Sequence, residues 1–415
     1  MPGSKQQSAC FIICAPTRVA PLIAVVFHLT SGSTASALQD LPASQARDSA
    51  GIRIFENARP ADNSRLPWRI GPEPSLSIGE VTGEEAYLLH GADDAVMLPG
   101  GRIVVANTGT GEIRVFDAAG VHQATWGRAG EGPGEFTALA GVASWPGDSI
   151  VAWDSQAHTI AVFDSEGALG RSFVLEAEGR PAEPRMSMRD GTVLGRIVDA
   201  GGGPGYRRER ITHEVRGADG RTLVSLGEHP GRESFINMEG RMAVFGLLPF
   251  SRSLHEASWG EMVVLAPDDH YEIRAHDRTT GELARIVRRD YTNRAPTREE
   301  VDRAIDDALE RTNLSGDRLE WTREGYKGMP LVESFPAFRA LLVDALDHLW
   351  VREATLPGMD RPAPLWTVFN AEGRVLGFVE TPEGLTVLEV GADYILGQAT
   401  DDLGVESVQV WALER

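Results

Sequence analysis

The sequence predicts an all-β fold, a six-bladed β-propeller, and three observations support this prediction. A unit of short strands and tight glycine turns occurs six times along the chain. The strand candidates are rich in β-branched and aromatic residues, which favour strands over helices. The composition, with 42% hydrophobic and 24% charged residues, is that of a globular protein able to bury a large core.

The clearest pair of repeats lies at residues 98–117 and 145–164. Each copy predicts a strand, a glycine turn, a second strand, a short loop and a third strand. Both copies end in a turn that begins with aspartate and ends with glycine, at residues 117–120 and 164–167. Aspartate at the first turn position accepts backbone hydrogen bonds, and glycine at the fourth tolerates the exit geometry, so the turn chemistry explains the repeat.

Four weaker copies bring the total to six, and a propeller buries the apolar faces of such sheets by stacking them radially. The last copy ends after residues 408–412 without a fourth strand, whereas residues 74–79 form a strand candidate that belongs to no copy. We therefore expect this N-terminal strand to complete the C-terminal blade and close the ring. Residues 52–55 are expected to add an edge strand.

The repeats resemble NHL-type repeats, and the chain is similar to secreted bacterial six-bladed β-propeller proteins of the NHL-like kind. The residues that carry the resemblance are 102–117, 148–164 and the loop 127–136. The match is loose in the third and fourth blades, where residues 201–205 and 228–250 are expected to be insertions. The resemblance implies the fold, and because most such proteins have no assigned activity, it implies no particular function.

The first 37 residues are typical of a signal peptide. They contain Lys5 and Arg18, no acidic residue, and an apolar run at residues 19–29 that is too short for a comfortable membrane span. Residues 35–37, Ala-Ser-Ala, form a cleavage signal. We therefore expect export to the periplasm or the cell exterior; an uncleaved anchor or a start site assigned too far upstream is the alternative.

This interpretation divides the chain into three parts: a signal peptide at residues 1–37, an N-terminal extension with an edge strand at 38–73, and the propeller at 74–415. Both cysteines, Cys10 and Cys14, precede the expected cleavage point. The mature chain would then hold no disulfide, no thiolate nucleophile and no membrane span.

One segment, at about residues 296–327, breaks the strand pattern between blades four and five. Thr297 and Glu300 form a capping box, and the apolar residues that follow fall on one face of a helix. This helical insertion is expected to be either a buttress on the rim of the propeller or a lid or docking helix.

The net charge of the chain limits the classes of partner that it is expected to bind. Aspartate and glutamate outnumber lysine and arginine by 60 to 40, which gives a net charge of -20. Binding to a phosphate backbone requires clustered basic residues, so a nucleic acid partner is not expected.

Alignment of the six copies indicates a candidate ligand site. The end of the second strand falls at an equivalent position in each blade, and five of the six residues there are polar. Since these strand ends open on one face, we expect them to line a binding surface. The six residues are Asn107, Asp154, Arg196, Pro267, Glu353 and Gln398.

Three of these residues, Asp154, Glu353 and Asn107, offer the oxygen ligands that calcium prefers. Calcium-dependent lactonases and related hydrolases resemble this arrangement. Aspartate and asparagine also cap loops where no metal binds, and Arg196 would place a positive charge near the same ring. Turn capping, a polar ligand site without metal, and a calcium site therefore all remain open.

The sequence favours a secreted binding or interaction module over an enzyme. The glycine-rich loop at residues 130–135 lacks the lysine and the serine or threonine of a phosphate cradle, and no nucleophile elbow is present. The expected partner is a protein, a peptide or a glycan. The alternative is a calcium-dependent hydrolase or lyase of the lactonase-like propeller type.

Overall fold

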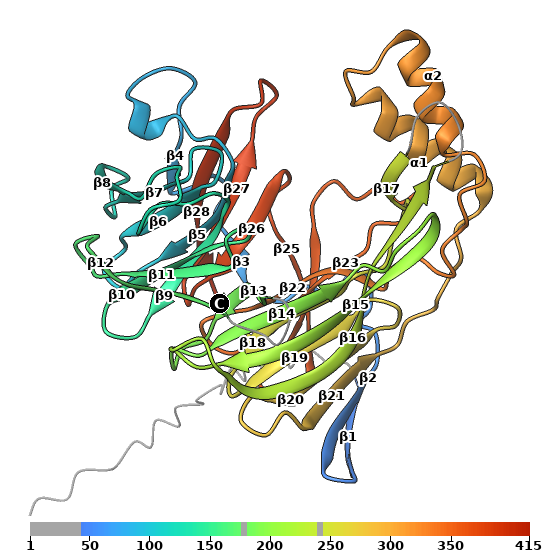
Figure 1. The fold of residues 1–415 in the computed structure, drawn as a ribbon. Coiled ribbons are helices and arrows are strands. Elements are labelled where there is room, and N and C mark those ends of the chain that lie inside the picture. Colours follow the sequence, from blue (N-terminus) through green and yellow to red (C-terminus); the bar gives the residue numbers. More distant parts are fainter. Residues whose placement is uncertain (1–42, 176–180, 239–243) are drawn as a thin grey trace, which may run out of the picture. The chain divides into compact units, whose positions relative to one another are not determined.

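A computed structural model describes residues 43–415, apart from residues 176–180 and 239–243 (Figure 1). The predicted signal peptide and both cysteines lie outside the described residues. In the part of the chain that is described, no helix is long and apolar enough to cross a membrane.

The described strands form six sheets, and each sheet is a blade built mainly from consecutive antiparallel strands. The predicted six-bladed β-propeller is therefore confirmed. Blade one contains β5 (Ala92–Met97), β6 (Ile103–Asn107), β7 (Glu112–Phe116) and β8 (His122–Trp126). Blade two contains β9 (Leu139–Trp145), β10 (Ser149–Asp154), β11 (Thr159–Phe163) and β12 (Leu169–Val174). Blade three contains β13 (Glu183–Ser187), β14 (Val193–Asp199), β15 (Gly205–Arg216), β16 (Thr222–Asn237) and β17 (Val244–Leu247).

Two of the remaining three blades, blades four and six, also include strands from the N-terminal part of the described chain. Blade four contains β18 (Leu254–Trp259), β19 (Met262–Pro267), β20 (Glu272–Asp277) and β21 (Leu283–Arg289), with β2 (Ile52–Asn57) and β1 (Ser44–Ser49) added at its edge. Blade five contains β22 (Phe338–Val343), β23 (Leu349–Glu353), β24 (Leu365–Phe369) and β25 (Val375–Glu380). Blade six contains β26 (Leu385–Val390), β27 (Tyr394–Thr400) and β28 (Glu406–Glu414), with β4 (Leu76–Ile78) and β3 (Arg69–Ile70).

The first strands of the blades hold the ring together. Contacts run from β5 to β9, from β9 to β13, from β18 to β22, from β22 to β26 and from β26 back to β5. Between β13 and β18, Arg185 donates a hydrogen bond to Glu256 at 3.0 Å. Each blade therefore packs its first strand beside the first strands of its two neighbours.

The N-terminal strand closes the ring as expected. β4 pairs antiparallel with β28, so that Ile78 lies opposite Val408. Ile78 is only 2% exposed and belongs to a core that combines residues of blades one and six. Burial of this apolar side chain links the closing strand to both ends of the propeller.

The predicted edge strand is also present, with a pairing that the sequence did not specify. β2 runs parallel to β21 of blade four, with Phe55 opposite Val287, and β1 then folds back on β2. Blade three differs from the expectation, because much of the supposed insertion at residues 228–250 is regular strand. β15 and β16 form a long hairpin that continues into β17.

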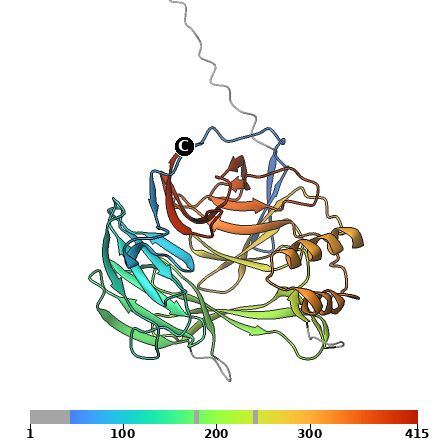
Figure 2. The ribbon, with the colours of Figure 1, turned by 90° about the horizontal axis from the view of Figure 1, so that it is seen from above.

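Two helices lie between blades four and five, α1 (Arg298–Glu310) and α2 (Gly316–Gly325), and Figure 2 shows them side by side. The predicted capping box of Thr297 and Glu300 opens α1. Val301, Ile305 and Leu309 are buried against a cluster that includes Leu248, which follows β17. α1 therefore packs on the end of the blade-three extension, as a buttress would.

Candidate functional site

The strand register tests the alignment of the predicted site positions. Asn107, Asp154, Arg196, Pro267 and Glu353 each lie opposite the first residue of the first strand in their blade. In blade six the register differs by one residue, because Ala399 rather than Gln398 lies opposite Leu385. Five of the six positions are thus structurally equivalent.

Asn107 and Asp154 are buried and hold the loops around them. Asn107 accepts a hydrogen bond from the backbone amide of His90 and donates one to Thr110, both at 2.7 Å. Asp154 accepts from four backbone amides and from the Thr137 hydroxyl. Burial alone would raise the pKa of Asp154, but these hydrogen bonds hold the pKa below its ordinary value. Both side chains act as caps of their loops.

Arg196 and Gln398 also have partners within their own blades. Arg196 donates to Glu183 at 2.9 Å, in the neighbouring strand of blade three. Gln398 donates to the Thr400 hydroxyl at 2.8 Å, within β27. The side chains of these two residues are therefore paired within their own blades. They do not form a shared cluster with the other predicted site residues.

Glu353 anchors a buried polar network between blades four and five. Its carboxylate accepts from Arg289 at 2.7 and 3.1 Å, from the Tyr271 hydroxyl at 3.0 Å and from the Thr367 hydroxyl at 2.7 Å. Arg59 adds a longer contact at 3.3 Å. Burial raises the pKa of Tyr271 well above its ordinary value, so this hydroxyl keeps its proton and serves as a donor.

The predicted calcium ligands use their oxygen atoms in these hydrogen bonds. Across the described ranges, no group of three or more histidine, cysteine, aspartate or glutamate side chains is arranged to hold a metal ion. The calcium site at Asp154, Glu353 and Asn107 stays a prediction, and the hydrogen bonds of all three favour a structural role.

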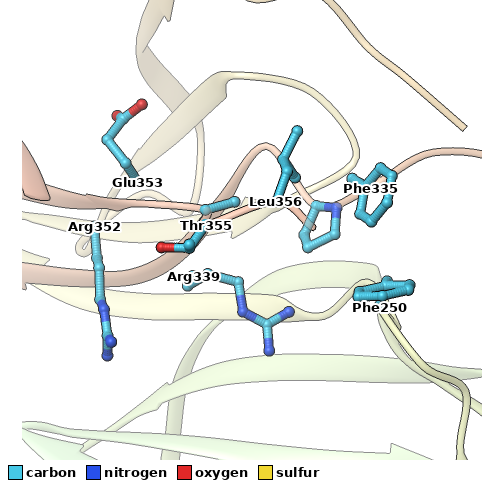
Figure 3. Close-up of a pocket in the computed structure, with 9 residues that line it drawn as sticks. Phe250, Phe335, Arg339, Arg352, Glu353, Thr355 and Leu356 are labelled. Carbon is cyan, nitrogen blue, oxygen red and sulfur yellow. The ribbon is translucent and has the colours of Figure 1, made fainter. Parts of the chain in front are cut away.

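A pocket of about 470 Å³ opens beside Glu353, where the second strand of blade five ends (Figure 3). One wall is apolar: the rings of Phe250 and Phe335 lie 4.7 Å apart between centroids. The other side is basic and is formed by β22 and β23. The pocket is lined by Phe250, Phe335, Pro336, Arg339, Arg352, Glu353, Ala354, Thr355 and Leu356.

Two arginines of the pocket lie on the opposite side of the strand from the Glu353 carboxylate. Successive residues of a strand point to opposite faces, and Figure 3 shows Arg352 directed away from Glu353 and toward the side where Arg339 lies. Arg339 is the extra residue of a β-bulge, since the register shifts between Phe338 and Ala340. The bulge thus places a second guanidinium group in the pocket.

No hydrogen bond or ion pair joins the guanidinium group of Arg339 or Arg352 to any other residue that the structure describes. Burial lowers the pKa of Arg352 below its ordinary value, and the positive charge of Arg339 lowers it further. The pocket therefore has a net positive character, although the chain as a whole is acidic.

Sequence reasoning identified Glu353 but missed both pocket arginines. Arg352 is adjacent to Glu353 in the sequence, and strand alternation alone would have placed it on the other face. Arg339 depends on a bulge that no periodicity reveals. Phe250 of the aromatic wall comes from the segment before blade four, far from β23 in sequence, and Phe335 comes from the segment just before β22.

Two further hollows adjoin other predicted positions. A pocket of about 530 Å³ follows the glycine-rich loop from Gly130 to Phe136 and reaches Gln156, close to Asp154. A smaller pocket, of about 300 Å³, contains Arg196 and its partner Glu183. The predicted face thus carries several hollows, and the one in blade five combines unpaired charge with an apolar wall.

Comparisons with known proteins add fold-level similarity only. No family model matches the chain, and no curated protein sequence matches it. A putative exported protein from Bacteroides fragilis is similar in structure, with 10% identity, coverage of 87% of this chain and 99% of that chain, and a TM-score of 0.48. A member of the DUF4221 family from Bacteroides vulgatus gives 11% identity, 84% and 99% coverage, and a TM-score of 0.49.

A more distant match is the calcium-binding protein regucalcin from Agrobacterium tumefaciens, with 12% identity, 78% and 90% coverage, and a TM-score of 0.36. Similarities at this level carry no functional argument. The fold assignment rests on the sheet topology of the chain itself.

Proposed function

We propose that this chain is an exported β-propeller binding module that holds its ligand in the blade-five pocket. The observation that carries the proposal is the pocket's combination of two unpaired arginines with an apolar wall. Export is supported by the signal-peptide pattern of residues 1–37. The NHL-type resemblance of the repeats in blades one and two supports a scaffold of that kind.

The pocket is built on rigid elements, as a binding site requires. Arg339 and Arg352 project from paired strands, and the Glu353 network fixes the end of β23. Ligand pockets usually measure roughly 300–1,000 Å³, so this one suits a small organic molecule or one residue of a peptide or glycan.

A calcium-dependent hydrolase or lyase of the lactonase-like type is the weaker hypothesis. It would need Asp154 and Glu353 to give up hydrogen bonds that hold loops and join two blades. These contacts are satisfied within the protein, so we favour binding over metal-dependent catalysis.

The experiment is a thermal-shift screen of metabolites, sugars and short peptides on the chain from Leu38. Three proteins are compared: the natural chain, Thr355→Trp, which fills the pocket, and Thr279→Trp, which places the same bulk on an exposed turn. A ligand that binds the folded state raises its stability by mass action. We expect at least one class to stabilise the natural chain and Thr279→Trp but not Thr355→Trp. Equal shifts in all three, or no shift from any class, would contradict the proposal.

A further inference from the structure

The blade-five pocket contains an electrostatic imbalance. Elsewhere, buried arginines have carboxylate partners: Arg289 is paired with Glu353, and Arg252 with Glu233. In the pocket, the half-buried Arg352 and the exposed Arg339 have no carboxylate partner among the described residues, and the charge of Arg339 acts unfavourably on Arg352. Two like charges that lie close together repel each other, so an anion bound between them would be held by both guanidinium groups and would relieve the repulsion.

The geometry keeps nearby carboxylates from neutralising this pair. Glu353 lines the same pocket, but its oxygens face Arg289, Tyr271 and Thr367 on the other side of the strand. The network therefore uses the one carboxylate that is adjacent to Arg352 in sequence. Both guanidinium groups remain available to a molecule that enters the pocket.

We propose that the blade-five pocket recognises a small organic oxyanion, a carboxylate or a phosphate ester, attached to an apolar or aromatic body. This inference rests on the proposed binding function and names its ligand class. Guanidinium groups present forked donors that match both carboxylate and phosphate oxygens. The rings of Phe250 and Phe335 offer an apolar surface for the rest of the molecule.

The test is isothermal titration calorimetry on the chain from Leu38 with four probes. Phenylphosphate and benzoate carry both features, benzyl alcohol lacks the charge, and inorganic phosphate lacks the apolar body. We expect phenylphosphate or benzoate to bind at least tenfold more tightly than the other two probes. The comparison of phenylphosphate with benzoate identifies which oxyanion the pocket prefers.

Variants locate the binding. Arg352→Gln and Arg339→Gln are each expected to weaken the preferred aromatic anion at least tenfold, which corresponds to about 1.4 kcal/mol. Arg171→Gln removes the same charge from an exposed position on β12 and should leave the affinity unchanged. Because Arg339→Gln also removes the repulsion acting on Arg352, its ligand-free melting temperature should equal or exceed that of the natural chain. The exposed Arg339 position keeps the test valid even if Arg352→Gln folds poorly.

The outcomes separate this inference from the proposed function. A neutral ligand could bind the natural chain and both arginine variants with the same affinity and fail to bind Thr355→Trp. The pocket would then be a binding site, but the oxyanion inference would be wrong. Absence of measurable heat from phenylphosphate and benzoate would overturn the inference as well. Anion binding that survives Thr355→Trp would overturn both proposals, because the anion would then bind outside the pocket.

Discussion

Arg289 donates two hydrogen bonds to the carboxylate of Glu353, at 2.7 and 3.1 Å, across the boundary between blades four and five. Both side chains are buried. The pair joins the last residue of β21 to the last residue of β23. The hydroxyls of Tyr271 and Thr367 donate hydrogen bonds to the same carboxylate. The residue that the sequence placed in a ligand ring is therefore part of the framework behind the pocket.

The first prediction concerns this ion pair. Glu353→Gln should lower the free energy of unfolding by about 3 kcal/mol, because Arg289 would keep its buried charge without a counter-charge. Urea unfolding measures the loss. The control is Glu380→Gln, whose pair with Arg65 is partly exposed and should contribute less than about 1 kcal/mol. Equal losses in the two variants would contradict the structural role given to Glu353.

The second prediction separates loop capping from calcium binding. Asp154→Ala should lower the free energy of unfolding by about 2 kcal/mol or more, because five hydrogen bonds to a carboxylate are lost. The loss should be the same with calcium as with a chelator. Asp164→Ala, which removes a more exposed turn cap, should cost less. A calcium-dependent stabilisation that disappears in Asp154→Ala would instead favour the hydrolase hypothesis.

The third prediction tests ring closure. Ile78→Ala should destabilise the chain by about 2–5 kcal/mol, since it opens a cavity in the core shared by blades one and six. Val81→Ala serves as the control, because Val81 is 62% exposed and its side chain contributes little to packing. Thermal and urea unfolding of both variants provide the comparison. A small effect at Ile78 would mean that the N-terminal strand does not stabilise the closed ring.

The fourth prediction concerns a row of three histidines between blades three and four. The ring of His229 lies 5.6 Å from His213 and 5.5 Å from His276, measured between centroids. Burial, together with the charges of His213, His276 and Arg274, lowers the pKa of His229 to about 4. The unfolded chain therefore takes up a proton as the pH falls below about 6.5, whereas the folded chain resists until about pH 4.

Stability should consequently fall on acidification between those two pH values. From pH 7 to pH 5, the natural chain should lose roughly 1–2 kcal/mol more than His229→Gln, as measured by urea unfolding at both pH values. His90→Gln, at an exposed position, should behave like the natural chain. Identical pH dependence in the natural chain and His229→Gln would show that this histidine does not resist protonation.

The parts of the fold that the sequence predicted depend on local chemistry. In the turns that begin at Asp117 and Asp164, the aspartate side chain accepts a hydrogen bond from a backbone amide of the same turn. The repeat can therefore be recognised in the sequence. The capping box at Thr297 likewise identifies α1. Closure of the ring by residues 74–79 was predicted by counting the strands in each repeat, because the last repeat lacked one strand. α2 lies within the predicted helical insertion at about residues 296–327, but a separate second helix was not predicted there because its residues show no clear apolar stripe.

The parts that could not be predicted depend on contacts between distant segments. The parallel pairing of β2 with β21 joins residues more than two hundred positions apart. The equivalence of Asp154 and Glu353 was visible in the alignment, but Arg289, which occupies the Glu353 carboxylate, comes from another blade. The pocket itself requires the bulge at Arg339 and the meeting of Phe250 with Phe335. No single repeat contains that information.

The most direct test of the central claim is an anomalous difference map from crystals of the natural chain soaked with 4-iodobenzoate and, in parallel, 4-iodophenyl phosphate. We expect an iodine peak against Phe250 and Phe335, with the oxyanion between Arg339 and Arg352. An iodine peak only at other sites, or none in either soak, would contradict the assignment of this pocket as the binding site.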